Sequence, residues 1–151
     1  FFTKSDLNDK WTIMYFGFTS CPSECPVTMS ELRKLINALR EKDFKLSDKQ
    51  WVLVTIDPER DSAADIDFYA SRFDPEFIGL RGDRATLLSL TTQLNVAKVQ
   101  PMKHEMHDIE ELSDHINNIV FINKDAQYFG FFRPPFEMSK LSLTYQSITT
   151  Q

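Results

Sequence analysis

The sequence has little glycine, few cysteines and no long apolar segment. Its 151 residues include only 4 glycines and 2 cysteines. No run without a charged residue is longer than 13 residues, the length of Trp11–Ser23, whereas a membrane-spanning helix needs about 20. Basic residues are also scarce, since 17 Lys and Arg stand against 22 Asp and Glu and give a net charge of −5. This balance argues against a protein that binds a nucleic-acid backbone.

The residues that are present are those of an ordinary globular domain. Apolar residues make up 42% of the chain and charged residues 26%, and 13 phenylalanines predict an aromatic-rich interior. The length is typical of one domain, so residues 1–151 are interpreted as a single domain. The first residue is Phe1 rather than Met, and we therefore expect that a signal peptide or an N-terminal anchor precedes it in the native protein.

Strand-like and helix-like segments alternate along the chain. Apolar runs with β-branched and aromatic residues predict strands, and apolar residues three or four positions apart predict helices. Because crossovers between successive strands favour parallel pairing and the last two strands form a hairpin, we expect an α/β fold whose mixed central sheet has helices on both faces. The expected strands are 11–18, 51–56, 77–80, 118–123 and 128–132, and the expected helices are about 16 residues from Pro26, then 62–73, 85–94 and 137–145.

The two cysteines stand close together in Cys21-Pro-Ser-Glu-Cys25-Pro26, between the first expected strand and the first expected helix. A disulfide across so short a loop stabilises little, about 2 kcal/mol in the chain-entropy model. A helix N-terminus favours the thiolate form, which is both a nucleophile and a metal ligand. Thiolates select Cu(I), Zn or iron–sulfur centres, and two cysteines are too few for a usual cluster. The pair is therefore predicted to be redox-active, metal-binding or both.

A third metal ligand is expected from the three histidines, His104, His107 and His115. His115 lies just before the strand expected at 118–123, at a strand mouth from which it can reach Cys21, and the neighbouring Asp114 is placed to orient its imidazole. The other two lie in a long polar stretch that also carries Met102 and Met106. Thioether and imidazole together suit copper, so this stretch is either an auxiliary copper relay or an ordinary polar loop.

A dense polar motif, Asp57-Pro-Glu-Arg-Asp61, follows the second expected strand. Two carboxylates around an arginine are compatible with acid–base chemistry. The interpretation we favour is structural: a strand end, a turn set by Pro58, and an Asp or Ser that caps the next helix. In that case the motif also shapes the rim of the site.

These motifs, in this order, resemble the Sco/SenC family. The resemblance rests on Phe16-Gly-Phe-Thr-Ser-Cys21-Pro-Ser-Glu-Cys25-Pro26, Asp57-Pro-Glu-Arg-Asp61 and Asp114-His115, and it covers most of the chain from about residues 2–7 onward. It implies a thioredoxin-like fold and a copper chaperone whose ligands are Cys21, Cys25 and His115. It also implies that an N-terminal anchor and a first hairpin have been removed.

The resemblance further implies a role and a location. Members of the family help to mature the dinuclear copper centre of cytochrome c oxidase, so the implied partners are the copper-bearing oxidase subunit and other copper chaperones or thioredoxin-like reductants. The implied place is the periplasmic face of the inner membrane or the mitochondrial intermembrane space. The main alternative is a thiol–disulfide oxidoreductase that needs only Cys21 and Cys25. A peroxidase of the same fold is disfavoured, because Phe18 stands where that chemistry has a Thr.

Overall fold

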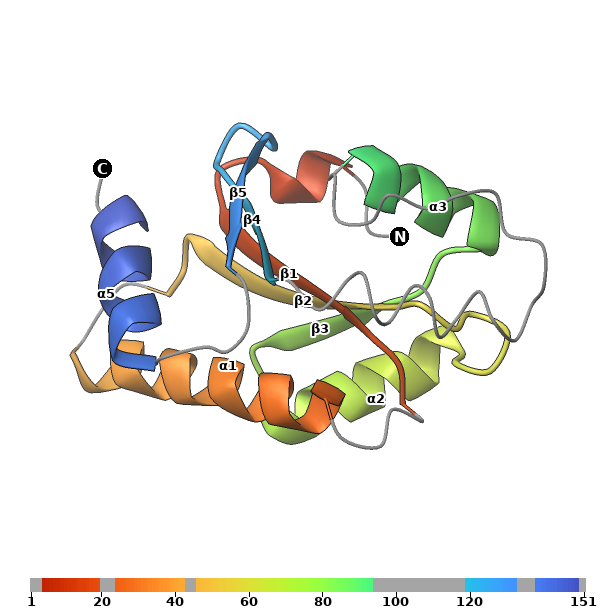
Figure 1. Cartoon of the computed structure of the whole chain (residues 1–151), viewed down its shortest axis with the longest axis horizontal. Coiled ribbons are helices and arrows are strands. Elements are labelled where there is room, and N and C mark those ends of the chain that lie inside the picture. The colour runs from red at the N-terminus through yellow and green to blue at the C-terminus, as the bar shows by residue number, and fades with distance from the viewer. Residues whose placement is uncertain (1–3, 20–23, 43–45, 94–118, 133–137, 150–151) are drawn as a thin grey trace.

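The structure, a computed structural model, describes residues 4–19, 24–42, 46–93, 119–132 and 138–149 (Figure 1). In these ranges a short 3₁₀ turn η1 is followed by strands that alternate with helices as far as β4, then by β5 and the helix α5. Their bounds are η1 Lys4–Leu7, β1 Trp11–Gly17, α1 Glu24–Glu41, β2 Lys49–Thr55, α2 Ala63–Phe73, β3 Phe77–Leu80, α3 Arg84–Gln93, β4 Ile119–Ile122, β5 Tyr128–Phe132 and α5 Met138–Thr149.

The strands form one mixed sheet in the order β3-β2-β1-β4-β5. β1, β2 and β3 run parallel, while β4 is antiparallel to β1 and to β5. The predicted mixed sheet and the predicted hairpin are therefore confirmed. Every residue of β1 and β2 is buried, as in the central strands of a sheet that is covered on both faces.

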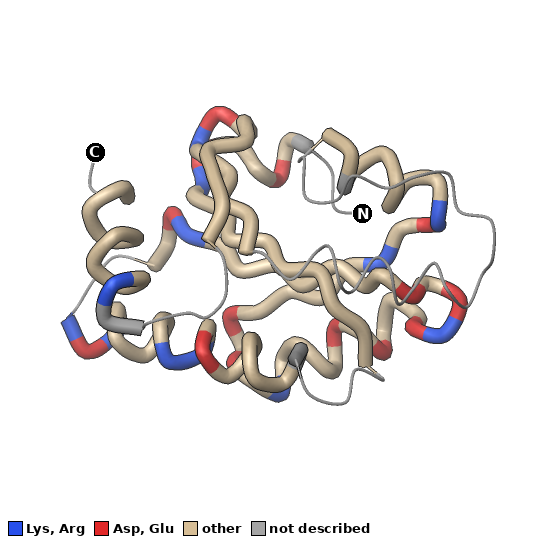
Figure 2. Tube along the Cα trace, in the orientation of Figure 1, with Lys and Arg blue, Asp and Glu red and all other residues tan. Residues whose placement is uncertain are grey.

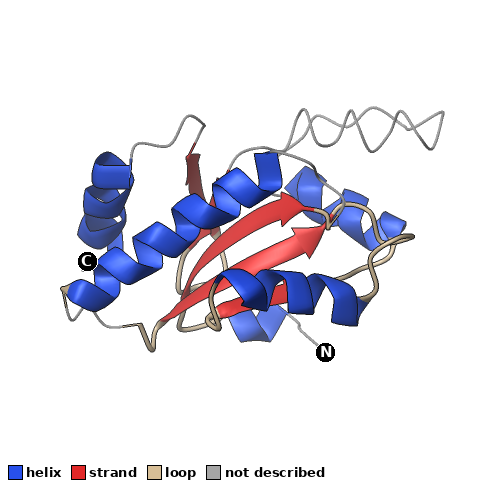
Figure 3. Cartoon of the chain, turned by 90° about the horizontal axis from the view of Figure 1, so that it is seen from below, coloured by secondary structure: helices blue, strands red, loops and turns tan. Residues whose placement is uncertain are grey.

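Alternate side chains of the strands enter two separate cores. One core contains Ile13, Tyr15 and Trp51 and is covered by α1, α2 and α5, whereas the other contains Phe16 and Val54 and is covered by α3. Helices therefore cover both faces, as predicted from the order of elements (Figure 1). Figure 3 shows α1 and α2 lying across the same face of the sheet, with the strands behind them.

The helices confirm the periodicity of the sequence, with differences at their ends. The apolar positions predicted for α1 are all at most 1% exposed, and these are Met29, Leu32, Leu35, Ile36 and Leu39. The end predicted for the last helix, Tyr145, is wrong, because α5 continues to Thr149. Its last turn contains weak helix formers, but Ile148 packs on the core and the Thr149 hydroxyl donates to the carbonyl oxygen of Tyr145 at 2.9 Å.

A partly buried ion pair connects α1 to the end of α2. Both terminal nitrogens of Arg40 donate to the two carboxylate oxygens of Asp74, at 2.6 and 2.8 Å. Asp74 is the residue that directly follows α2, and it is only 5% exposed. A two-pronged guanidinium–carboxylate pair is directional as well as strong, so it fixes the relative position of the two helices.

Candidate metal centre

The candidate centre is predicted at the edge of the sheet where the parallel strands β1 and β2 end. Ligands of open α/β sheets bind at this carboxyl edge. The backbone N–H of Ile56 donates to the carbonyl oxygen of Gly17 at 2.8 Å, so the chains leaving the two strands remain side by side. The segment Phe18–Thr19 leads from there toward Cys21, and the turn 57–61 follows β2.

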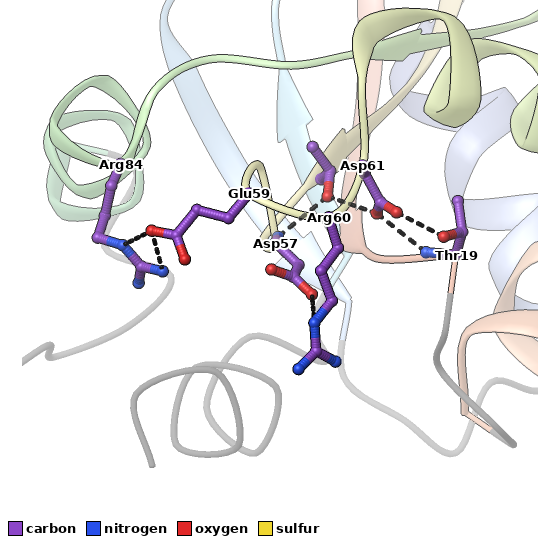
Figure 4. Close-up of polar contacts among 7 residues, drawn as sticks. Thr19, Asp57, Glu59, Arg60, Asp61 and Arg84 are labelled. Atoms are coloured by element: carbon purple, nitrogen blue, oxygen red, sulfur yellow. Dashed lines mark hydrogen bonds and ion pairs between the residues drawn. The ribbon is translucent and has the colours of Figure 1, made fainter. Parts of the chain in front are cut away.

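Asp61 joins these two segments (Figure 4). Its carboxylate accepts hydrogen bonds from the backbone N–H of Thr19 at 3.0 Å, from the Thr19 hydroxyl, and from the Thr55 hydroxyl at 2.8 Å. Asp61 is 2% exposed, so these three donors replace the water that it loses on folding. The carboxylate thus fixes the backbone two residues before Cys21.

The remainder of the motif is a turn held on several sides. The backbone N–H groups of Arg60 and Asp61 donate to the carbonyl oxygen of Asp57 at 3.1 and 2.9 Å. Glu59 pairs with Arg84 of α3 at 3.0 Å (Figure 4). Ser62 caps α2 through a reciprocal capping box with Asp65. The structural interpretation of the motif is therefore confirmed, with Ser62 rather than an Asp as the cap.

Asp57 is the exception within this turn. It is 2% exposed, and Oδ2 lies 3.6 Å from Nε of Arg60, but Oδ1 has no hydrogen-bond partner among the described residues. Burial raises the pKa of the Asp57 carboxyl above its usual range, although the Arg60 charge opposes the shift. Burying a carboxylate with one unpaired oxygen lowers the stability of the fold, but it places a polar group at the edge of the sheet where ligands are expected to bind.

We expect Asp57→Asn to stabilise the protein by about 1 kcal/mol at neutral pH, because the amide removes a charge that burial disfavours. Since the native carboxyl takes up a proton more readily than the unfolded one, the wild type gains stability relative to Asp57→Asn as the pH falls through the raised pKa. The difference between the two proteins should therefore shrink in acid. Urea denaturation at several pH values measures it, and a difference that grows toward low pH would contradict this account.

The sequence-predicted ligands fall largely outside the described residues. Of Cys25 only the backbone is described, in the first turn of α1, while Cys21, Asp114 and His115 lie outside the described residues, as do Met102, His104, Met106 and His107. Among the described side chains no three His, Cys, Asp or Glu converge as a metal-binding group. The site residues therefore remain predictions, whereas their supporting elements are described.

Sequence reasoning missed the bond between Asp61 and Thr19, 42 positions apart. The available signal was the parallel pairing of β1 with β2, which brings the residues after each strand to one edge. The same topology bears on β4, since Val120 pairs with Met14 in antiparallel register. The N-terminal end of β4 therefore lies beside the carboxyl-terminal half of β1.

The arrangement of the sheet and its helices defines the class of fold. Its mixed sheet with helices on both faces is similar to a solved thioredoxin-type protein of Neisseria meningitidis, with a TM-score of 0.56, 20% identity and coverage of 97% of this chain and 77% of that one. It is also similar to BsSco, a protein whose structure is described as that of a cytochrome c oxidase assembly protein with a disulfide switch, with a TM-score of 0.68, 16% identity and coverage of 97% and 84%. The fold is thioredoxin-like.

The chain belongs to the SCO1/SenC family, whose profile matches residues 1–148. It is 32% identical over 140 residues to a Stutzerimonas stutzeri protein that its name describes as copper-binding, covering 93% of this chain and 66% of the relative. It is 31% identical to the mitochondrial SCO1 homolog 1 of Arabidopsis thaliana, covering 93% and 40%. The copper-bound structure of Arabidopsis ScoI aligns with a TM-score of 0.77 at 25% identity, covering 98% and 89%. The chain thus spans two thirds or less of the length of these curated relatives. Within the described ranges, no helix is both long and apolar enough to cross a bilayer.

Proposed function

We propose that this chain binds one copper ion through Cys21, Cys25 and His115 and takes part in assembling the dinuclear copper site of cytochrome c oxidase. The observation that carries the proposal is the match to the SCO1/SenC family, which spans all three residues. The names of its relatives add support, because one is described as copper-binding, another was solved with copper bound and a third belongs to the oxidase assembly proteins. By the same reasoning we propose that the protein works on the periplasmic face of an inner membrane, or in the mitochondrial intermembrane space.

The described elements are suited to such a site. Cys25 lies in the first turn of an 18-residue helix, whose N-terminal partial positive charge favours thiolate over thiol. Thr19, two residues before Cys21, is fixed by the buried carboxylate of Asp61. His115 precedes by four residues the start of β4, the strand that enters the sheet beside β1. These features support a meeting of the three side chains at the carboxyl edge.

Two thiolates and one imidazole form a ligand set that suits Cu(I). Because the ligands must lose protons, copper affinity should fall as the pH falls. Copper is cargo in this role, passed on by exchange of ligands with an acceptor. In the alternative redox role, Cys21 and Cys25 give two electrons to a disulfide of the client, form their own disulfide and release two client thiols. The oxidised pair no longer offers thiolates, so the chain cannot bind copper through these cysteines while they form a disulfide.

An anaerobic Cu(I) titration of the reduced chain tests the proposal. We expect one equivalent to bind to the reduced protein and none at this site to the disulfide-oxidised protein. Sulfur-to-copper charge-transfer absorption after Cu(II) addition reports thiolate ligation. Binding that persists unchanged after oxidation would exclude the cysteines as ligands.

The variant His115→Ala separates the two roles. Removing a partner of a metal ligand already costs about 10- to 100-fold in affinity, so removing the ligand itself should weaken copper binding by at least about tenfold. Reduction of a model disulfide should continue, because it needs only Cys21 and Cys25. The control is His104→Ala with His107→Ala, which should leave the equilibrium affinity unchanged and, if the loop is a copper relay, should slow transfer. A His115→Ala protein that holds copper as tightly as the parent would overturn the ligand set.

A further inference from the structure

A cavity of about 270 Å³ lies between α1 and α2. Its wall on α1 consists of Pro26, Ser30 and Arg33, and its wall on α2 consists of Tyr69, Arg72 and Phe73. Pro26 directly follows Cys25, so the cavity begins one residue from a proposed copper ligand. It is slightly smaller than the range of about 300–1,000 Å³ typical of small-molecule sites and has the size for one side chain of a partner.

Two of the three residues in the α2 wall of this cavity are aromatic, and they pack against each other. The rings of Tyr69 and Phe73 pack edge to face, with centroids 5.3 Å apart. Asp74, the next residue, is clamped by Arg40 of α1, which fixes the width of the groove between the helices. Val27 and Phe68 directly follow and precede the lining residues Pro26 and Tyr69 in the sequence, and their side chains are 62% and 67% exposed. Large exposed apolar side chains are a feature of protein interaction sites.

The two charged residues in the lining of the cavity are both arginines, although the chain as a whole is acidic. Arg33 and Arg72 are both exposed, and neither forms a hydrogen bond or ion pair with a residue that the structure describes. Asp74, whose charge Arg33 influences, is already bound by Arg40. Figure 2 shows charged residues of both signs distributed over the helices and loops of the chain. Two guanidinium groups that form no ion pair with a described carboxylate, beside an aromatic pocket, complement a segment that carries an apolar anchor between carboxylates.

We infer that this groove docks an acidic segment of the protein with which the chain exchanges copper, an apolar side chain entering the cavity and its flanking carboxylates pairing with Arg33 and Arg72. The identity of the partner rests on the proposed function, whereas the existence of the groove follows from the residues of α1 and α2 that line the cavity. A partner seated there approaches the N-terminal end of α1 and hence the proposed copper ligands. Docking and transfer thus occur at adjoining surfaces without competition for the same side chains.

The first test uses two synthetic peptides and the whole chain labelled with ¹⁵N. One peptide has Leu and Trp between pairs of Asp, and the other has the same core between pairs of Lys; neither contains Cys, His or Met. We expect saturable binding of the acidic peptide alone, with chemical-shift changes confined to residues 26–33 and 68–73. Equal binding of both peptides, shifts elsewhere, or shifts that follow protein concentration rather than peptide, as expected for a second copy of the chain, would overturn the inference.

Matched variants separate local charge from net charge. Arg33→Gln with Arg72→Gln removes the two groove cations, while Lys34→Gln with Lys42→Gln removes two exposed cations outside it; both take the formal charge from −5 to −7. Exposed ion pairs contribute up to about 1 kcal/mol each. The double variant of Arg33 and Arg72, called the groove pair, should therefore bind the acidic peptide about five- to tenfold more weakly than the parent does, and the control variant less than about twofold more weakly. Ser30→Phe, which fills the cavity and keeps the charge, should also weaken binding.

The second test measures transfer from the copper-loaded chain to a soluble copper-bearing domain of the oxidase subunit. At acceptor concentrations below saturation, the groove pair should slow transfer by about fivefold while copper stoichiometry and affinity stay those of the parent. The control pair should transfer at the parental rate. Unchanged transfer by the groove pair would overturn the docking inference alone, whereas a parent chain that binds no copper would overturn the proposed function.

Discussion

Gly79→Ala should destabilise the protein by about 3 kcal/mol or more, the upper range for inserting atoms into a closely packed interior. A Cβ at Gly79 would collide with the carbonyl group of Ile66 and would lie 2.5 Å from the Cα atom of Asp67. All of these atoms belong to the backbone of α2, so no rotation of a side chain relieves the collision. β3 and α2 would have to separate, and the hydrogen bond from the Gly79 N–H to Asp67 Oδ1 at 3.0 Å would break.

The matched control is Gly130→Ala in β5. Apart from Gly130 and its two chain neighbours, no described residue has an atom within 4 Å of a Cβ built there, and the backbone at Gly130 does not have a positive φ. We expect a change within about 0.5 kcal/mol, as for other surface substitutions. Urea denaturation of the two variants gives the comparison directly. Equal stabilities would show that α2 is free to move away from β3, against the close packing of these two elements.

Much of the fold could be predicted because its signals are local. The apolar run of β1 and the spacing of Met29, Leu32, Leu35, Ile36 and Leu39 depend only on neighbours in the sequence, and the structure confirms them. The last turn of α5 was missed because Ile148 is held by tertiary packing that local propensity does not register. Gly79 gave no signal either, since its need for a bare backbone arises from a helix 12 residues away in sequence.

The candidate centre could be predicted as a set of residue types but not as a geometry. Cys21, Cys25 and His115 stand out through spacing and chemistry and stay predictions, and the family match spans their positions. What the sequence alone did not reveal is the support beneath them. The link between Asp61 and Thr19 depends on which strands pair, and the groove beside Pro26 depends on how α2 lies against α1. Such features follow from topology, which becomes readable only once the sheet order is known.

Asp61→Ala should cost about 3 kcal/mol of stability, because it leaves the N–H of Thr19 and the hydroxyls of Thr19 and Thr55 without their acceptor. Hydrogen bonds to a charged acceptor are the stronger ones, and Asp61 is almost fully buried, so water cannot readily replace it. Copper affinity should fall as well, since the backbone that leads into Cys21 loses its anchor. Glu41→Ala, an exposed carboxylate at the end of α1, is the control and should change neither quantity appreciably.

Asp61→Asn distinguishes a lost anchor from a lost charge. Its amide oxygen still accepts from the Thr19 N–H and the Thr55 hydroxyl, while its NH₂ group donates to the Thr19 hydroxyl, which can rotate to accept. We therefore expect Asp61→Asn to lose only about 1 kcal/mol and to retain most of the copper affinity. Urea denaturation and anaerobic Cu(I) competition measure the two effects. If Asp61→Asn lost copper as completely as Asp61→Ala while remaining folded, the negative charge itself, and not the position of Thr19, would be what the copper site requires.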